Sequence, residues 1–126
     1  MIDLNQGPCA IKRLRGCSCG NEYLAVTPQG DIFPCHQFVG DDRWKMGNVL
    51  DGTFNTSIKD YFSQANVYKK EDCKNCWAKF YCSGGCNANN YQYEGDVLKA
   101  HTISCDLEKK RLECAIMIQA ALAEAE

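Results

Sequence analysis

The sequence predicts a small α+β protein in which metal ligation supplies much of the core. Three patterns indicate this: β-prone segments at 23–26 and 32–33, an amphipathic helical pattern over 106–123, and ten cysteines among 126 residues. A chain of this length can form one domain, and small domains often use metal centres in place of apolar core. We expect residues 1–16 to be a linker or tail and residues 17–126 to form the metal-binding domain.

The two β-prone segments predict a hairpin. Proline, glycine and aspartate occupy the residues between them, and Gly30 allows the positive φ that such a turn requires. The turn would bring Cys35 back beside the segment that carries Cys17 and Cys19. A third short strand is expected within residues 45–49.

The rest of the chain is expected to be helical. The first helix is predicted over residues 57–65, with Thr56 as its N-cap. The block 73–86 predicts short helical turns, interrupted at Ser83-Gly84-Gly85, where the glycines would let the backbone approach a metal centre closely. Residues 87–93 are expected to form another helix.

The last predicted helix is the clearest one. Over residues 106–123 the apolar side chains recur at helical spacing, so they share one face. That face carries Leu107, Cys114, Ile118 and Leu122. On this pattern we expect Cys114 to be a buried free thiol and not a ligand.

Composition excludes several classes of function. The net charge is −2 and no basic stripe is present, so nucleic acid is not an expected partner. No apolar stretch is long enough to span a bilayer. The first six residues lack the basic and apolar regions of a signal peptide, and we expect a cytoplasmic location.

Seven cysteines and one glycine form a spaced array. Cys19-x10-Gly30-x4-Cys35 comes first, Cys73-x2-Cys76-x5-Cys82-x3-Cys86 follows, and Cys105 ends the array. Spacings of two or three residues let two sulfurs reach one metal centre from a single turn of backbone. Disulfides are disfavoured because nothing in the sequence directs export to an oxidising compartment.

The spacing alone leaves two kinds of metal open. Four thiolates from the block 73–86 would close one structural zinc site, but that assignment leaves Cys19, Cys35 and Cys105 unused. Two all-cysteine cubane clusters need eight thiolates, and Cys17 supplies an eighth. Iron–sulfur ligation is therefore favoured over zinc.

The full array resembles the seven-cysteine motif of the SPASM domain, the C-terminal extension of many radical SAM enzymes that modify ribosomal peptides. The resemblance covers about residues 17–110, and every spacing fits. The neighbouring sequence, with Gly16-Cys17-Ser18-Cys19-Gly20 and the residues after Cys35 and Cys76, is most similar to maturases that install thioether crosslinks in cysteine-rich SCIFF peptides.

The resemblance implies two auxiliary [4Fe–4S] clusters with interleaved ligands. It assigns Cys19, Cys35 and Cys86 to the first cluster. The second cluster would be held by Cys73, Cys76, Cys82 and Cys105. The fourth ligand of the first cluster stays open between Cys17, Cys9 and a substrate thiolate.

The resemblance also implies a role and partners. The domain would transfer electrons and position substrate, with a ribosomal precursor peptide and a radical SAM core domain as partners. The Cys-x3-Cys-x2-Cys motif that binds S-adenosylmethionine is missing, since Asn89 stands where the third cysteine would follow Cys82 and Cys86. We therefore expect no catalytic residue and no catalysis by this chain alone. The alternatives are a zinc-binding interaction module and a free-standing ferredoxin-like electron carrier.

Overall fold

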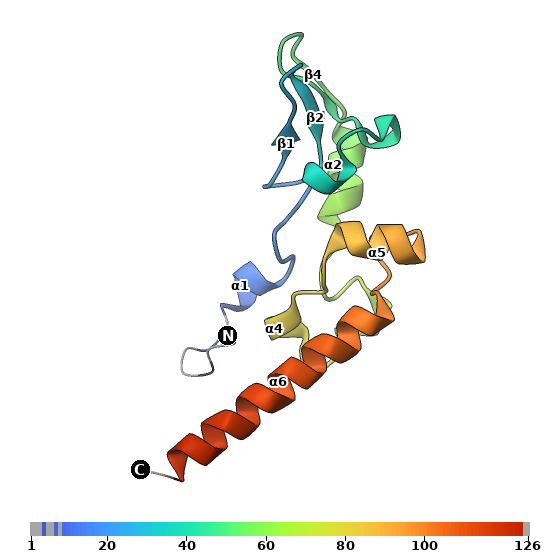
Figure 1. The fold of residues 1–126 in the computed structure, drawn as a ribbon. Helices are drawn as coiled ribbons and strands as arrows, with labels where there is room; N and C mark the ends of the chain where they lie inside the picture. Colours follow the sequence, from blue (N-terminus) through green and yellow to red (C-terminus); the bar gives the residue numbers. More distant parts are fainter. Residues whose placement is uncertain (1–3, 5–6, 8, 125–126) are drawn as a thin grey trace.

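The computed structural model describes residues 4, 7 and 9–124. The fold is α+β, as predicted: an antiparallel sheet lies at one end of an elongated molecule and a long helix at the other (Figure 1). In chain order the elements are α1 (Ala10–Arg13), β1 (Ala25–Val26), β2 (Asp31–Phe33), η1 (His36–Phe38), η2 (Asp42–Trp44), β3 (Gly47–Asn48), β4 (Thr53–Phe54), α2 (Thr56–Ser63), α3 (Glu71–Lys74), α4 (Lys79–Cys82), α5 (Asn87–Glu94) and α6 (Thr102–Ala123).

The sheet contains the predicted hairpin, the predicted third strand and a fourth strand that was not predicted. Its strands run in the order β1-β2-β3-β4, each antiparallel to the next. Gly30 turns the chain between β1 and β2 with φ +86°, as expected from its position. The fourth strand is only two residues long, and its start is fixed by Asp51, whose carboxylate accepts the backbone N–H of Thr53 at 2.8 Å.

The helix predicted over residues 57–65 forms as α2, with a different cap. Asn55 is the N-cap, and its side-chain oxygen accepts the backbone N–H of Ser57 at 2.9 Å. The prediction of Thr56 as the cap is wrong. The Asn55 side chain already accepts the Ser57 N–H, which is free at the start of the helix, so Thr56 is the first helical residue. The predicted helices in the block 73–86 and over 87–93 are present as α3, α4 and α5.

The C-terminal helix α6 is longer and more exposed than the sequence predicts. It begins at Thr102, and the side chain that is buried along its described length is Leu112. Leu107 and Leu122, placed on the predicted apolar face, are about 60% exposed. The prediction of a buried Cys114 is wrong: this thiol is exposed, because α6 extends away from the rest of the described chain (Figure 1).

Two small apolar clusters replace a single large core, and each contains cysteines. The first cluster lies between the sheet, α2 and α5 and includes Cys19 and Cys35. Five aromatic rings pack together in this cluster, with neighbouring centroids 4.9–5.9 Å apart: Phe38 and Phe62 within it, and Trp44, Tyr61 and Tyr91 against it. The second cluster is smaller and includes Val67, Cys73, Ala100 and, at its edge, Cys105.

A hydrogen bond fastens the first cluster to the segment after α5. The Tyr61 hydroxyl donates to the Asp96 carboxylate at 2.8 Å, and burial together with this bond raises the pKa of Tyr61 to about 12. Replacing Tyr61 with phenylalanine is expected to lower the free energy of unfolding by about 1–2 kcal/mol, because a hydrogen bond to a charged group is lost. Denaturant unfolding followed by circular dichroism measures the change.

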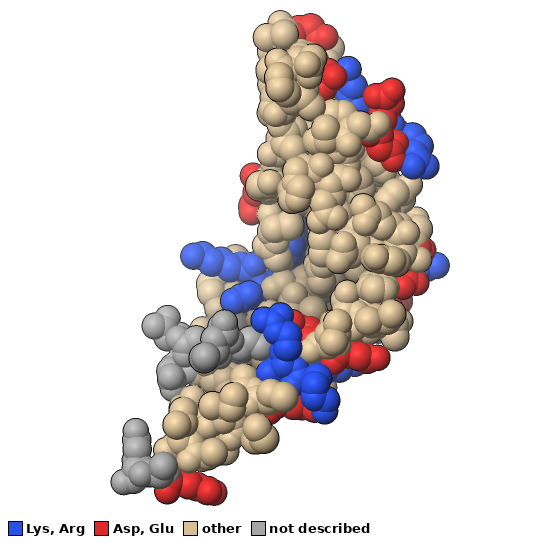
Figure 2. All heavy atoms as spheres, viewed as in Figure 1, with Lys and Arg blue, Asp and Glu red and all other residues tan. Residues whose placement is uncertain are grey.

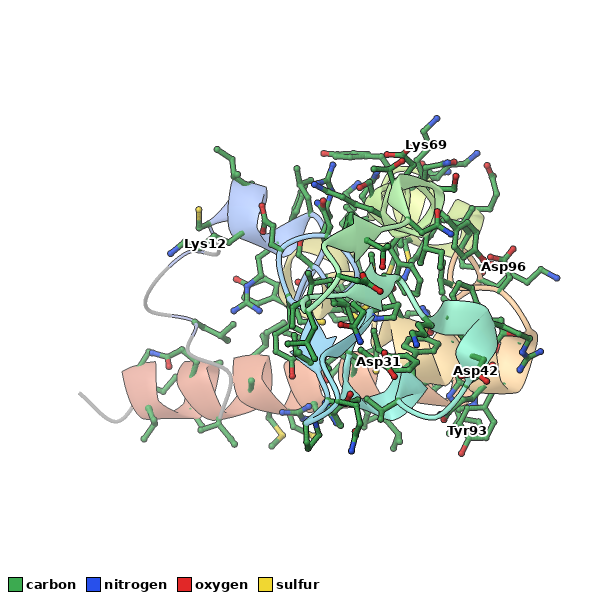
Figure 3. The ribbon with its side chains drawn as sticks, turned by 90° about the horizontal axis from the view of Figure 1, so that it is seen from above. Lys12, Asp31, Asp42, Lys69, Tyr93 and Asp96 are labelled. Atoms are coloured by element: carbon green, nitrogen blue, oxygen red, sulfur yellow. The ribbon has the colours of Figure 1, made fainter. Side chains whose placement is uncertain are left out.

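The matched control for this substitution is Tyr93→Phe. The Tyr93 side chain lies at the surface, 67% exposed (Figure 3), so losing its hydroxyl should change stability by less than about 0.5 kcal/mol. Equal effects of the two substitutions would contradict the role given to the Tyr61 hydroxyl.

Charged side chains are mixed over the surface. On the face drawn in Figure 2, Lys and Arg lie beside Asp and Glu in both halves of the molecule. None of the helices in the described part of the chain combines the length and hydropathy needed to cross a bilayer.

Candidate metal centre

Four cysteines from the helical end of the molecule line one cavity of about 260 Å³. We call them the helical set: Cys73, Cys76, Cys82 and Cys105. A water molecule takes up about 30 Å³ in the liquid, so the cavity has room for a group with several atoms. Among the residues that the structure describes, no three His, Cys, Asp or Glu side chains are grouped so as to hold a single metal ion.

Short local structure places each member of the helical set. Cys73 lies in α3 and Cys82 ends α4, while Cys105 lies in the first turn of α6. The backbone N–H of Cys76 donates to the Cys73 carbonyl at 3.0 Å, and this tight turn brings two sulfurs separated by two residues to the same cavity.

The surroundings of Cys73 and Cys105 favour neutral thiols when no metal is bound. Burial raises the pKa of Cys73 to about 11, and burial also raises the pKa of Cys105. Cysteine ligands bind metal as thiolates, so the negative charge in this cavity needs a cation to compensate it. A thiophilic metal centre meets that need.

The other four predicted ligands gather between the hairpin and α5. We call them the hairpin set: Cys17, Cys19, Cys35 and Cys86. The thiols of Cys17 and Cys19 are hydrogen-bonded to each other, and Cys35 lies within electrostatic reach of Cys17 and Cys86. The hairpin therefore returns Cys35 to the segment that carries Cys17 and Cys19, as predicted.

Two amide side chains donate hydrogen bonds to sulfurs of the hairpin set. The Asn87 amide donates to Cys19 Sγ at 3.6 Å, and the Gln37 amide donates to Cys86 Sγ at 3.7 Å. Hydrogen bonds to ligand sulfur stabilise its negative charge, which is one of the ways in which proteins adjust iron–sulfur centres.

In the Cys17–Cys19 pair, Cys17 loses its proton more easily than Cys19 does. The hydrogen bond with Cys19 lowers the pKa of Cys17 to about 6, opposed by burial and aided by backbone N–H groups. The same bond, together with burial, raises the pKa of Cys19. A thiolate at Cys17 is thus available near neutral pH, which suits a metal ligand.

A segment of left-handed backbone separates Cys82, in the helical set, from Cys86, in the hairpin set. Ser83, Gly84 and Gly85 have φ of 61°, 82° and 74°, so the chain reverses between Cys82 and Cys86. The Ser83 hydroxyl in this segment is buried without a hydrogen-bond partner among the described residues. Ser83 directly follows the ligand candidate Cys82, and its buried hydroxyl is a donor that a cluster sulfur would satisfy, so the donor set fits an iron–sulfur cluster.

Sequence reasoning missed the polar residues that hold this segment. The Lys70 ammonium is buried and donates to the Gly84 carbonyl and to Asn87 Oδ1, both at 2.8 Å. Asn90, also buried, donates to the Gly84 carbonyl at 3.2 Å and accepts the His101 N–H at 3.1 Å, which fixes the start of α6. Lys70 lies in a run of charged residues, and no pattern in the sequence distinguishes it from its neighbours.

The two remaining cysteines lie outside both sets. Cys9 is exposed at the N-cap of α1, and Cys114 is exposed on α6. Part of the predicted tail, residues 1–16, lies outside the described residues; its described end contains α1, which packs against α4.

Comparison with known proteins bears directly on these two sets. Residues 17–77 match the SPASM iron–sulfur cluster-binding domain. The match covers slightly less than half of the chain, including the whole sheet and the first cysteines of both sets. The SPASM match agrees with the resemblance drawn from the cysteine spacing and supports an auxiliary iron–sulfur cluster domain.

The chain is also similar to an uncharacterized protein of Archaeoglobus fulgidus. The two are 26% identical over 96 residues, which is 75% of this chain and 23% of that protein. The chain thus spans about a quarter of the length of the curated relative it matches.

Proposed function

We propose that this chain is the auxiliary cluster domain of a radical SAM maturase, holding two [4Fe–4S] clusters and serving electron transfer and substrate positioning. The observation that carries the proposal is the arrangement of eight cysteines in two sets of four, with Cys82 and Cys86 facing different sets. A four-iron cluster uses four thiolates, so the number of ligands in each set matches one cluster.

The helical set and the hairpin set differ in how the fourth ligand of each cluster is identified. Four cysteines around a common cavity supply all the ligands of one cluster at the helical end. In the hairpin set we assign Cys17 as the fourth ligand, because its side chain is already hydrogen-bonded to Cys19 and lies within electrostatic reach of Cys35. Full ligation by the protein favours electron transfer over direct binding of a substrate thiolate.

When bound, iron–sulfur clusters supply one-electron transfer, and the chain's own residues adjust the energy of that transfer. Asn87 and Gln37 donate hydrogen bonds to ligand sulfurs, and burial removes Cys19 and Cys35 from water. Hydrogen bonding and solvent exposure at the sulfurs are the main levers by which a protein sets such potentials.

The proposed reaction in the complete enzyme is thioether formation between a cysteine sulfur and a carbon of a ribosomal precursor peptide. The radical SAM core domain would supply S-adenosylmethionine binding, since this chain has no Cys-x3-Cys-x2-Cys motif. The greater length of the Archaeoglobus relative supports placing the chain within a larger protein. The peptide would be positioned near the two clusters, and this chain alone would not modify it.

Metal analysis of the anaerobically reconstituted chain tests the proposal. We expect about eight iron and about eight sulfide per chain, with a broad thiolate-to-iron absorption, because each set holds one four-iron cluster. Zinc without sulfide in the isolated protein, and no uptake of iron, would contradict the proposal and support a zinc-binding interaction module instead.

A further inference from the structure

Lys70 is a fully buried cation between the two cysteine sets. Its side chain is 1% exposed, and its ammonium donates to the Gly84 carbonyl and to Asn87 Oδ1. The adjacent Lys69 is exposed and points away from the molecule (Figure 3). Two neighbouring lysines thus carry the same charge in opposite environments.

The partners of Lys70 lead to both sets. Gly84 lines the cavity of the helical set. Asn87 accepts from Lys70 through its oxygen and donates through its nitrogen to Cys19 Sγ in the hairpin set. The ammonium also lies within electrostatic reach of Cys73 and Cys82 on one side, and of Cys19 and Cys86 on the other.

A buried ammonium needs negative charge nearby. Both of its hydrogen-bond acceptors are neutral oxygens, and burial lowers the pKa of Lys70, opposed by the negative charge that the nearby cysteines carry when they ionise. Removing a cation from water costs several kcal/mol unless it is paired. Thiolates that ligate metal on both sides supply this pairing.

We propose that Lys70 is the shared counter-ion of the two metal centres and raises the reduction potential of both. The inference rests on the proposed function, because it requires a cluster at each set. Reduction adds one electron, and hence one negative charge, to a cluster. A buried positive charge favours that added charge, so its removal should make both clusters harder to reduce.

Redox titration of the reconstituted chain, monitored by electron paramagnetic resonance, tests this role. Dithionite supplies one electron to each cluster. In Lys70→Met both midpoint potentials should shift to more negative values, whereas Lys70→Arg, which keeps the charge, should remain near the wild type. Lys69→Met is the matched control and should leave both potentials unchanged, because solvent screens a surface charge.

Iron and sulfide content, measured first, separates this inference from the proposed function. If the wild-type chain holds no clusters, the proposed function fails. If Lys70→Met is fully loaded and either potential is unshifted, the shared role of Lys70 is wrong. If Lys70→Met does not bind clusters, the result for Lys70→Arg decides. Full cluster content in Lys70→Arg supports a requirement for the positive charge, and failure of Lys70→Arg to bind clusters overturns the inference.

Discussion

Replacing Cys76 with alanine is expected to remove about half of the bound iron and to lower the melting temperature strongly, because one four-iron cluster loses a ligand. Cys76 is partly exposed, so little apolar packing is lost with its side chain. The four-thiol cavity closes around residues from α3, α4 and α6, and without its metal these short elements have only a small apolar cluster to hold them. Iron analysis and thermal unfolding under anaerobic conditions measure both effects.

The control is Cys114→Ala, which removes an exposed thiol on α6. Iron content and melting temperature should both match the wild type. Unchanged iron and an unchanged melting temperature in Cys76→Ala would count against ligation by the helical set.

Replacing Gly20 with alanine is expected to lower the free energy of unfolding by about 2–5 kcal/mol. Gly20 follows Cys19, has φ +74°, and donates its N–H to the Pro34 carbonyl at 2.9 Å. A Cβ atom here would lie 2.5 Å from Cγ of Phe62, a fully buried ring in the first apolar cluster. The backbone would have to move, and it would move Cys19 with it.

The variant Gly52→Ala distinguishes the steric clash with Phe62 from the backbone strain of a left-handed residue. Gly52 has nearly the same φ, +72°, but a Cβ atom there meets nothing within 4 Å. Its replacement should lower the free energy of unfolding by about 1–2 kcal/mol, the penalty for a left-handed residue alone. Thermal unfolding of both variants in parallel provides the comparison, and equal melting temperatures would show that Phe62 adjusts to the new side chain without loss.

The sequence was informative where local chemistry decides the structure. Turn residues around Gly30 predicted the hairpin, and the hairpin in turn predicted that Cys35 returns to the segment of Cys19. The division of Cys82 and Cys86 between two sets came only from the family resemblance, because the spacing of the block 73–86 alone also allows one four-thiol site. The structure adds a physical reason, the left-handed segment between them.

Two features could not be predicted because they depend on packing between distant parts of the chain. The apolar spacing of α6 predicted a buried face, but such spacing cannot show whether another element covers that face, and Cys114 is exposed. Lys70 has a neighbour of the same type and charge, and only the fold decides which of the two lysines is buried.

The contacts of Gly84 have a consequence for substitutions in this part of the chain. Any side chain at position 84 would lie 3.3–3.6 Å from the Lys70 side chain, in a backbone conformation that already favours glycine. Asn87 binds the same ammonium. Positions 70, 84 and 87 are therefore physically coupled: a larger residue at position 84 would press on the Lys70 side chain, and loss of the Asn87 amide would remove one of the two acceptors of its ammonium.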